Sequence, residues 1–197
     1  MAPILNDDGM DLLFREARSF DSWRDRPVSD VTLMALYDLM RWGPTSANCS
    51  PTRILFLRSD QAKSRLRPAL SKANVAKTLT APVCALLAFD TRFYEALPRL
   101  FPQSPDARSW FDSNEPKARE TAFRNASLQG GYFILAARAL GLDCGPMSGF
   151  DNAKVDAEFF PDGRVKSNFL CALGHGDPAA LPPRAPRLEF EEICQIL

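Results

Sequence analysis

Five short polar segments contain most of the side chains that could bind a ligand. Each lies just outside an apolar stretch, where a loop would expose it. Together they offer cations, hydroxyls, an Asn amide and tight turns with free backbone N–H groups, an inventory that suits an anionic, hydrogen-bond-rich organic ligand. Each segment taken alone is more often an ordinary loop. The segments are Ala17–Ser19, Gly43–Pro51, Asn74–Lys77, Gly145–Phe150 and Arg184–Arg187.

Several other chemistries are excluded by residue counts. The chain has one His, His175, so a metal site with two His ligands is impossible and a Ser–His or Cys–His unit would need that residue. The five Cys are widely spaced and include no CxxC, which favours buried, reduced thiols over zinc ligands or disulfides. Gly174–Ala179 matches G-x-G-x-x-A formally, but Pro178 leaves no helix to receive a pyrophosphate. We therefore expect no metal site, and we reject the glycine-rich motif as a dinucleotide-binding fingerprint.

Charge and hydropathy narrow the partners. The 197 residues carry 24 Lys and Arg against 24 Asp and Glu, so no net field attracts nucleic acid or an anionic membrane. The first residues lack the basic and apolar regions of a signal peptide, and the longest apolar stretch, 82–89, is too short to span a bilayer. We expect one domain, 1–197, in the cytoplasm, with a small-molecule substrate and neither nucleic-acid nor membrane partners.

Hydrophobic periodicity and capping residues predict the elements that position these segments. Ser29 caps a helix over 30–42, where Leu33, Leu36, Tyr37 and Met40 form one apolar face. Apolar runs predict strands over 53–58, 83–89 and 165–173, with another strand after the longest helix. Further helices are expected over 12–18, from the Ser59–Asp60 cap to the interruption at Pro68, from the Asp151 cap to 160, and over 189–197.

The longest helix signal runs from Glu115 to Leu140 and ends at Gly141. Small residues recur along it every four positions, which allows either a close contact with a second subunit or close packing inside one subunit. Residues 91–113 combine prolines with aromatic residues and predict broken helices, either a mobile lid over a site or an ordinary insertion with its own small cluster. The small residues are Ala118, Ala122, Ala126 and Gly130.

Helix exceeds strand in this pattern, and the long helical block between strands does not suit regular βαβ winding. The sequence therefore predicts an α+β domain with a small sheet among helices.

Taken in order, the polar segments resemble the flavin-dependent nitroreductase family. Members carry an R-x-S-type start, an A-P-S-S-x-N-x-Q-P-type loop, an N-x-x-K, a P-x-E-G-F and a terminal R-x-P. The corresponding residues here are Arg18-Ser19, Gly43–Pro51, Asn74 with Lys77, Pro146–Phe150 and Arg184–Pro186. The strings 42–51, 106–111, 120–125 and 145–151 are similar in detail to the subgroup of malonic semialdehyde reductases in pyrimidine (uracil) degradation.

This resemblance implies a mixed central sheet flanked by helices and an intertwined homodimer that binds two FMN molecules at the subunit interface. It assigns the phosphate and ribityl chain to Arg18, Ser19, Lys77 and Arg184. From the other subunit it brings Thr45, Ser46 and Asn48 to the ring or ribityl side. It assigns the pyrimidine edge to Asn74 and the neighbourhood of N5 to Pro146, Ser148 and Gly149.

Three positions depart from the family pattern. Ala17 stands where many members have a basic residue, so Arg15 is an alternative phosphate ligand to Arg18. Ser148 replaces a common Glu, which changes the charge beside N5. Cys49-Ser50 stands where members have x-Q, so that contact is not carried over.

The resemblance also implies the reaction. FMN carries the chemistry through N5, with NADPH or NADH as a transient hydride donor, so no catalytic side chain is assigned. The expected reaction is ping-pong reduction of malonic semialdehyde to 3-hydroxypropanoate, with Arg92, Arg99 and Arg108 as candidate carboxylate ligands. A broad NAD(P)H nitroreductase or quinone reductase, and a flavin-binding protein without turnover, remain alternatives. His175 is expected to be structural, because its Gly-His-Gly resembles the family's Gly-Tyr-Gly turn.

Overall fold

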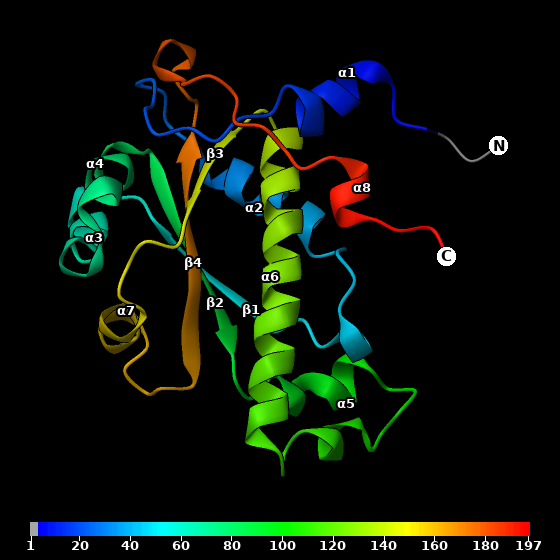
Figure 1. Ribbon diagram of the computed structural model, residues 1–197. Coiled ribbons are helices and arrows are strands. Elements are labelled where there is room, and N and C mark those ends of the chain that lie inside the picture. The colour runs from blue at the N-terminus through cyan, green and yellow to red at the C-terminus, as the bar shows by residue number, and fades with distance from the viewer. Residues whose placement is uncertain (1–3) are drawn as a thin grey trace.

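Residues 4–197 are described by a computed structural model, in which helices pack on both faces of a small sheet (Figure 1). The strand order is β1–β2–β4–β3, and each neighbouring pair is antiparallel. The expected mixed sheet is thus antiparallel within these residues; its parallel component is reduced to a single bridge between Ser19 and Cys144. The strands are β1 (Thr52–Leu57), β2 (Val83–Asp90), β3 (Asp143–Met147) and β4 (Val165–Gly174).

The helices account for most of the remaining regular structure. They are α1 (Asp7–Met10), α2 (Asp30–Met40), α3 (Asp60–Ser64), α4 (Lys72–Thr80), α5 (Leu97–Leu100), α6 (Glu115–Ala139), α7 (Asn152–Phe159) and α8 (Phe190–Ile193). A π-helical turn, Asp11–Arg15, extends α1, and single 3-10 turns cover Ser46–Asn48, Arg67–Ala69, Phe93–Ala96, Ala107–Trp110 and Pro178–Ala180.

The predicted helix caps are confirmed. Ser29 and Ser59 each accept a backbone N–H three residues on, at 3.1 Å, and Asp151 does the same for α7 at 3.2 Å. These bonds satisfy amides that the first turn leaves without partners. The longest helix ends as expected at Gly141, whose φ of +72° is the left-handed conformation that glycine adopts without a steric penalty.

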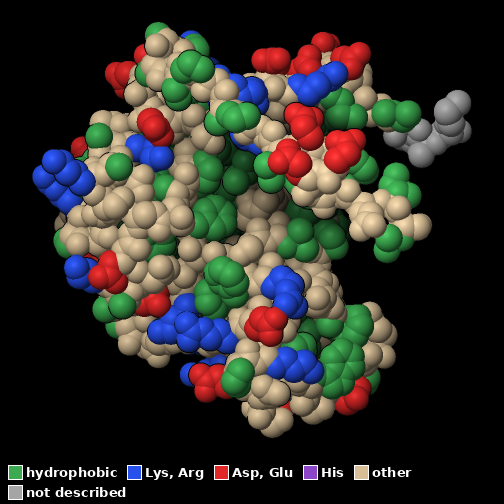
Figure 2. All heavy atoms as spheres, in the orientation of Figure 1, with side chains coloured by type: hydrophobic (Ala, Val, Ile, Leu, Met, Phe, Trp, Pro, Cys, Tyr) green, Lys and Arg blue, Asp and Glu red, His purple; other side chains and the backbone are tan. Residues whose placement is uncertain are grey.

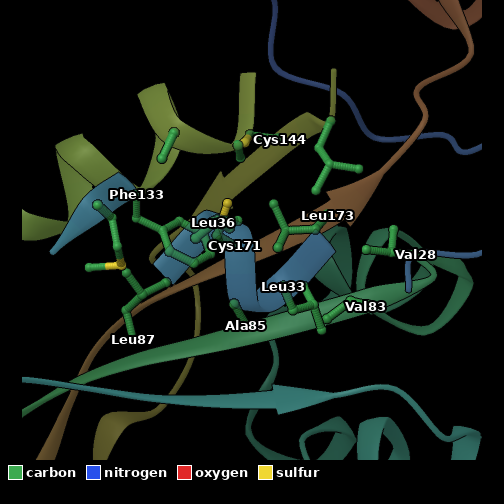
Figure 3. Packing of buried hydrophobic residues seen from close by; sticks show 14 residues of the cluster. Val28, Leu33, Leu36, Val83, Ala85, Leu87, Phe133, Cys144, Cys171 and Leu173 are labelled. Atoms are coloured by element: carbon green, nitrogen blue, oxygen red, sulfur yellow. The ribbon is translucent and has the colours of Figure 1, made fainter. Parts of the chain in front are cut away.

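Alternation along β2 divides the core into two layers. Val83, Ala85 and Leu87 face α2 and α6, whereas Cys84 and Leu86 face the side of α3, α4 and α7. Figure 3 shows the first layer, where labelled side chains from α2, α6 and β4 lie together, among them Leu36, Phe133 and Cys171. The strand β2 is buried along its whole length, as predicted, and this burial on both faces explains its continuous apolar run.

A third cluster lies beneath residues 91–113. Phe93, Leu97 and Phe111 pack on Ala118, Ala122 and Ala126 of α6. The predicted broken helices are confirmed, with an apolar cluster of their own. The small-residue stripe is occupied within the subunit: a Cβ on Gly130 would lie 2.5 Å from the ring of Phe169. The stripe therefore belongs to the internal packing of one subunit.

Four sequence expectations need correction. The first helical stretch covers 7–15 rather than 12–18, because Asn6 caps it. Tyr37 points outward and is 52% exposed, so the apolar face of α2 is narrower than its periodicity indicated. The β1 strand is only partly buried, since it is an edge of the sheet. The terminal helix is limited to the four residues of α8.

Among residues 4–197, no helix is both long and apolar enough to cross a membrane.

Candidate functional site

Two distant parts of the chain cross at the start of β3 and bring two arginines together. Arg18 donates to the carbonyl of Pro182, and Arg184 donates to the carbonyl of Ala17 at 3.2 Å. Ser19 bridges to Cys144 of β3. We call Arg18, Ser19 and Arg184 the basic end. Because both arginines are held through neutral main-chain carbonyls, neither positive charge is cancelled by these bonds.

A cavity of about 200 Å³ adjoins the basic end and is lined by Arg18, Phe20, Arg138 and Asp143, among others. The Nε of Arg138 is buried and has no hydrogen-bond partner within residues 4–197, although another of its nitrogens donates to the carbonyl of Leu13 at 3.0 Å. The lining also includes the carboxylates of Asp11 and Glu16, so the two arginines face three acidic side chains and the cavity is not positively charged overall. The volume lies below the ~300–1,000 Å³ typical of ligand pockets, so it does not enclose a cofactor by itself.

Lys77 is expected to bind the same phosphate as Arg18 and Arg184, but it is paired differently. Its side chain is 13% exposed, and Nζ lies 2.9 Å from Oδ1 of Asp21. It runs along Gly145 toward the backbone of Phe20, so it reaches the same strand as the basic end but is already paired with a carboxylate. Asp21 therefore lowers the net positive charge that Lys77 could offer to an anion at this position.

Asn74 and Gly149, predicted to line the same site, lie in contact. Asn74 Nδ2 donates to the Gly149 carbonyl at 3.0 Å, and the Ser71 amide donates to the same oxygen at 2.9 Å. This arrangement leaves Oδ1 of Asn74 without a donor among residues 4–197, as an acceptor for an imide-type N–H. Ser148 beside it is exposed.

Pro146 and Gly145 correct one expectation. The sequence predicts a polar turn over 145–150, but residues 145–147 continue β3 and pair with residues 172–170 of β4. Gly145 is needed there because a Cβ would lie 2.3 Å from the Phe20 carbonyl oxygen. The turn follows the strand, at Ser148 and Gly149, and a bridge between Leu70 and Phe150 closes it.

Thr45, Ser46 and Asn48 occupy the loop 45–52, which has unusual backbone geometry. Ala47, Asn48 and Ser50 all have positive φ, at 50°, 49° and 38°. Ala47 and Ser50 each cost about 1–3 kcal/mol in this conformation, whereas Asn adopts it more readily; such strained residues persist only where their surroundings enforce them, a feature common at functional sites. The Ser50 amide donates to Thr45 Oγ1 at 3.2 Å, and Asn48 Nδ2 donates to the Leu100 carbonyl at 2.8 Å.

The predicted residues therefore form two groups in one subunit. The 45–52 loop packs on α5 and α6, whereas Asn74, Lys77 and Gly149 lie where α4 meets β3. Figure 1 separates them, with α4 on one side of α6 and the loop before β1 on the other. One subunit thus does not bring Thr45, Ser46 and Asn48 to the basic end.

A buried ion network supports the segment beside the loop. Asp90, 2% exposed, accepts from Arg53 at 2.7 Å and from Arg164 through two bonds at 2.9 Å. Burial alone would raise the pKa of Asp90, but hydrogen bonds from Arg164 and the Arg92 amide, with the nearby Arg53 charge, hold it below its ordinary value. Arg164 also pairs with Glu95 at 3.0 Å and so joins the sheet to residues 91–113.

The main chain of His175 holds a neighbouring segment in place. Its carbonyl accepts from the Arg24 amide at 2.8 Å, which fixes the chain before α2. Burial and the charge of Arg26 lower the pKa of His175. Four of the five thiols are buried as expected, whereas Cys194, in the exposed terminal segment, is not, so the expectation is wrong there. Burial raises the pKa of Cys49 to about 11 and that of Cys84 to about 12, which makes both poor nucleophiles. Among residues 4–197, no three His, Cys, Asp or Glu side chains form a metal-binding group.

Two polar residues of the site were missed from sequence. Asn125 and Gln129 are 4% and 5% exposed on α6, and both bond to the 45–52 loop. Their spacing of one helical turn on the small-residue face was the available signal. It indicates a polar contact in an otherwise apolar layer, but it does not identify the partner.

Comparison with known proteins identifies the class. The model of the nitroreductase family matches residues 15–175, and the chain belongs to this family. A Burkholderia lata protein with the provisional name NADH dehydrogenase/NAD(P)H nitroreductase is 57% identical over 192 residues, covering 98% of each chain. A protein of the same provisional name from Cupriavidus pinatubonensis is 55% identical, covering 95% of this chain and 96% of the other.

Solved structures share the fold. A Bacillus subtilis nitroreductase structure superposes with a TM-score of 0.88 at 22% identity, covering 98% of this chain and 100% of the other. An Exiguobacterium sibiricum nitroreductase in complex with FMN superposes with a TM-score of 0.81 at 18% identity, covering 100% of both chains. These likenesses establish the nitroreductase-like fold predicted from the sequence.

Proposed function

We propose that this chain is an FMN-dependent NAD(P)H oxidoreductase that reduces malonic semialdehyde to 3-hydroxypropanoate in pyrimidine degradation. The observation that carries the flavin proposal is the crossing of Arg18 and Arg184, which puts two uncancelled cations at one edge of the sheet. The family membership, the NAD(P)H in the relatives' names and the FMN bound to a structural neighbour support the same cofactors.

The residues present fit FMN. Arg18, Ser19 and Arg184 would hold the phosphate, and the free Oδ1 of Asn74 would accept from the pyrimidine edge of the ring. Pro146, Ser148 and Gly149 would line the ring. Lys77 would contribute after exchanging Asp21 for the phosphate. When bound, FMN supplies hydride transfer through N5 from the nicotinamide to the second substrate, in ping-pong order.

A homodimer completes this site in the proposal, with Thr45, Ser46 and Asn48 contributed by the second subunit. Large apolar side chains support it: Val31, Met34 and Trp42 on or beside α2 are 75%, 67% and 77% exposed. An apolar groove of about 440 Å³ runs between α2 and β1. The segment around α8 stands away from the body in Figure 2, with exposed Leu188, Phe190, Ile193 and Ile196 that the partner's groove would cover.

For the aldehyde substrate, the proposal names Arg99 as the ligand of the carboxylate. Arg99 lies in α5 next to Leu100, whose carbonyl holds Asn48, and it has no ion pair within residues 4–197. Arg108 faces Asp112 at 3.8 Å, and Arg92 follows the Asp90 network. The buried thiols suit the reducing cytoplasm, where we propose that residues 1–197 act as one domain.

The decisive experiment is a cofactor and substrate assay on the purified protein. FMN should bind with a melting shift, and anaerobic NADPH or NADH should bleach it. Malonic semialdehyde should then restore the yellow colour faster than nitrofurazone or a quinone. A colourless protein without a melting shift contradicts the flavin proposal. The reverse order of oxidants favours the broad nitroreductase or quinone reductase that the relatives' names support. Bleaching without any reoxidation by substrates leaves a flavin-binding protein without turnover.

A further inference from the structure

Two buried amides on α6 hold the two ends of the 45–52 loop. Asn125 Oδ1 accepts from the Ser46 amide at 2.8 Å, and its Nδ2 donates to the Thr121 carbonyl at 2.9 Å. One turn further on, Gln129 Oε1 accepts from the Thr52 amide at 3.1 Å and the Thr52 hydroxyl at 2.6 Å. The loop is therefore fastened at its start and its end to a single rigid helix.

The orientation of Asn125 is determined by both of its bonds. Its carbonyl side accepts from the loop and its NH₂ side donates to its own helix, so a reversed amide would face a donor with a donor. The bond to Ser46 also spans 79 positions of sequence. An apolar residue here would leave the Ser46 amide without its partner, at a cost well above the net value of an ordinary hydrogen bond.

Between the two fastened ends, the loop is forced into a conformation that it would not adopt alone. Ala47, Asn48 and Ser50 are left-handed, and the Asn48 side chain bonds outward to Leu100 instead of satisfying its own turn. Ser46 and Asn48 remain exposed. Asn125 and Gln129, together called the clamp, therefore hold these polar side chains at the surface of the subunit in a strained backbone conformation. Packing of the core does not require that conformation.

We propose that Asn125 and Gln129 are positioning residues for the cofactor, which hold Ser46 and Asn48 in the conformation that contacts the flavin of the second subunit. This inference rests on the proposed FMN function and the shared site. It adds that α6 of one subunit sets the geometry around the cofactor bound mainly by the other, without touching that cofactor itself.

The first test replaces Asn125 and measures FMN affinity by fluorescence quenching on the full-length dimer. Asn125→Ala should weaken binding about tenfold. Asn125→Asp keeps an acceptor for the Ser46 amide, and its second oxygen can replace the donor to the Thr121 carbonyl only when protonated, so it should restore affinity to within about twofold in an assay at about pH 5. Ser127→Ala is the matched control, because it removes two side-chain hydrogen bonds on the exposed face of the same helix, to the Phe123 carbonyl and from Asn168 Nδ2, and neither reaches the loop. Wild-type affinity in Asn125→Ala, or equal loss in the Asp variant, overturns the inference.

Should Asn125→Ala fail to fold, Thr52→Val tests the other end of the clamp. It removes the hydroxyl bond to Gln129 and keeps the backbone bond, and it should weaken FMN binding about threefold. Unchanged affinity would overturn the role of Gln129.

The second test asks which subunit's flavin the clamp serves. Asn125→Ala and Arg184→Ala protomers are co-expressed with different tags, and mixed dimers are purified. If the loop acts on the partner's flavin, both defects fall in one site and the other site is intact. We therefore expect one tight FMN per mixed dimer; none overturns action across the interface. Failure of Arg184→Ala to weaken FMN binding would contradict the proposed function instead, so the two failures are distinguishable.

Discussion

The basic end and the 45–52 loop are held in opposite ways. Arg18 and Arg184 are tied only by single bonds to main-chain carbonyls, near the surface, and their charges stay available. The loop is strained and is fastened through buried amides, with its side chains already committed in part. The basic end can adjust to a ligand at little cost, whereas the loop is preorganised and loses little freedom on binding. Charge should therefore govern affinity at one end and geometry at the other.

Removing the positive charges of the basic end should lower FMN affinity more than any other change. The double variant Arg18→Ala, Arg184→Ala should weaken FMN binding by at least about 100-fold, since each charge-assisted bond contributes roughly 1.5–3 kcal/mol. The affinity of the wild type should fall with added salt, and that of the variant, which keeps only Lys77, should fall less. Titration at two ionic strengths measures both effects. Arg187→Ala is the control, because Arg187 bonds only within its own segment among residues 4–197. Equal affinity in wild type and double variant would refute the phosphate role.

The ion network under residues 91–113 should contribute to the free energy of unfolding and not to the charge that attracts FMN. Asp90→Asn leaves Arg53 and Arg164 without their buried partner and should cost about 3 kcal/mol, measured by urea unfolding. Glu95→Gln, an exposed partner of Arg164, should cost less than about 1 kcal/mol.

The pH dependence of that difference has a defined sign. The folded state lowers the pKa of Asp90, so its contribution is complete above the ordinary carboxyl value of about 4. It is lost as the pH falls from there through the lowered folded value. Wild type and Asp90→Asn should therefore converge in unfolding free energy only in acid; a constant difference down to the lowest measurable pH would contradict the network.

A substitution in β3 should couple fold to cofactor at the basic end. Gly145→Ala places a Cβ against the Phe20 carbonyl, so Ser19 and Phe20 must move away from the strand. Overpacking of this kind costs about 2 kcal/mol, and FMN affinity should fall with it. Gly131→Ala has open space around the new methyl group and should be neutral or slightly stabilising. Thermal melts with and without FMN separate the two effects; full affinity in Gly145→Ala would show that the crossing tolerates displacement.

The smallest effect is expected where α6 ends, at Gly141, which lines the cavity beside the basic end without contributing charge to it. Gly141→Ala should cost about 1 kcal/mol through its positive φ alone, because nothing lies near the new Cβ. Gly141→Asn should cost less, since Asn tolerates this conformation. Neither should change FMN affinity. A selective loss of affinity would indicate that the end of α6 belongs to the basic end.

Local rules explain what could be predicted from sequence. Ser29, Ser59 and Asp151 cap their helices by accepting from amides three residues away, and the apolar run of β2 is buried on both faces. Sequence reasoning also grouped Asn74 with Gly149 and Arg18 with Arg184, through the family resemblance.

What could not be predicted depends on distant partners. Gly145 and Pro146 disfavour a strand locally, yet both pair with β4. A glycine is required at position 145 because the carbonyl of Phe20, which is distant in sequence, approaches it closely. Periodicity gave Tyr37 the inner face of α2, but it does not define how wide that face is. Asn125 finds its partner 79 positions away, and Lys77 finds Asp21 from another segment. No local pattern encodes these choices.

The crossing at the basic end also has a consequence for biosynthesis. Arg18 and Pro182 are 164 positions apart. At ~5–20 residues per second, a ribosome needs roughly 10–30 s to make the residues between them. The sheet strands can all pair before residue 182 emerges, yet until then Arg18 has no partner and Arg184 has not been made. A nascent chain therefore completes its core before it can complete the basic end, and a chain truncated before residue 182 would keep that core and lose the crossing. Cofactor capture would then act as a late check that translation has passed this point.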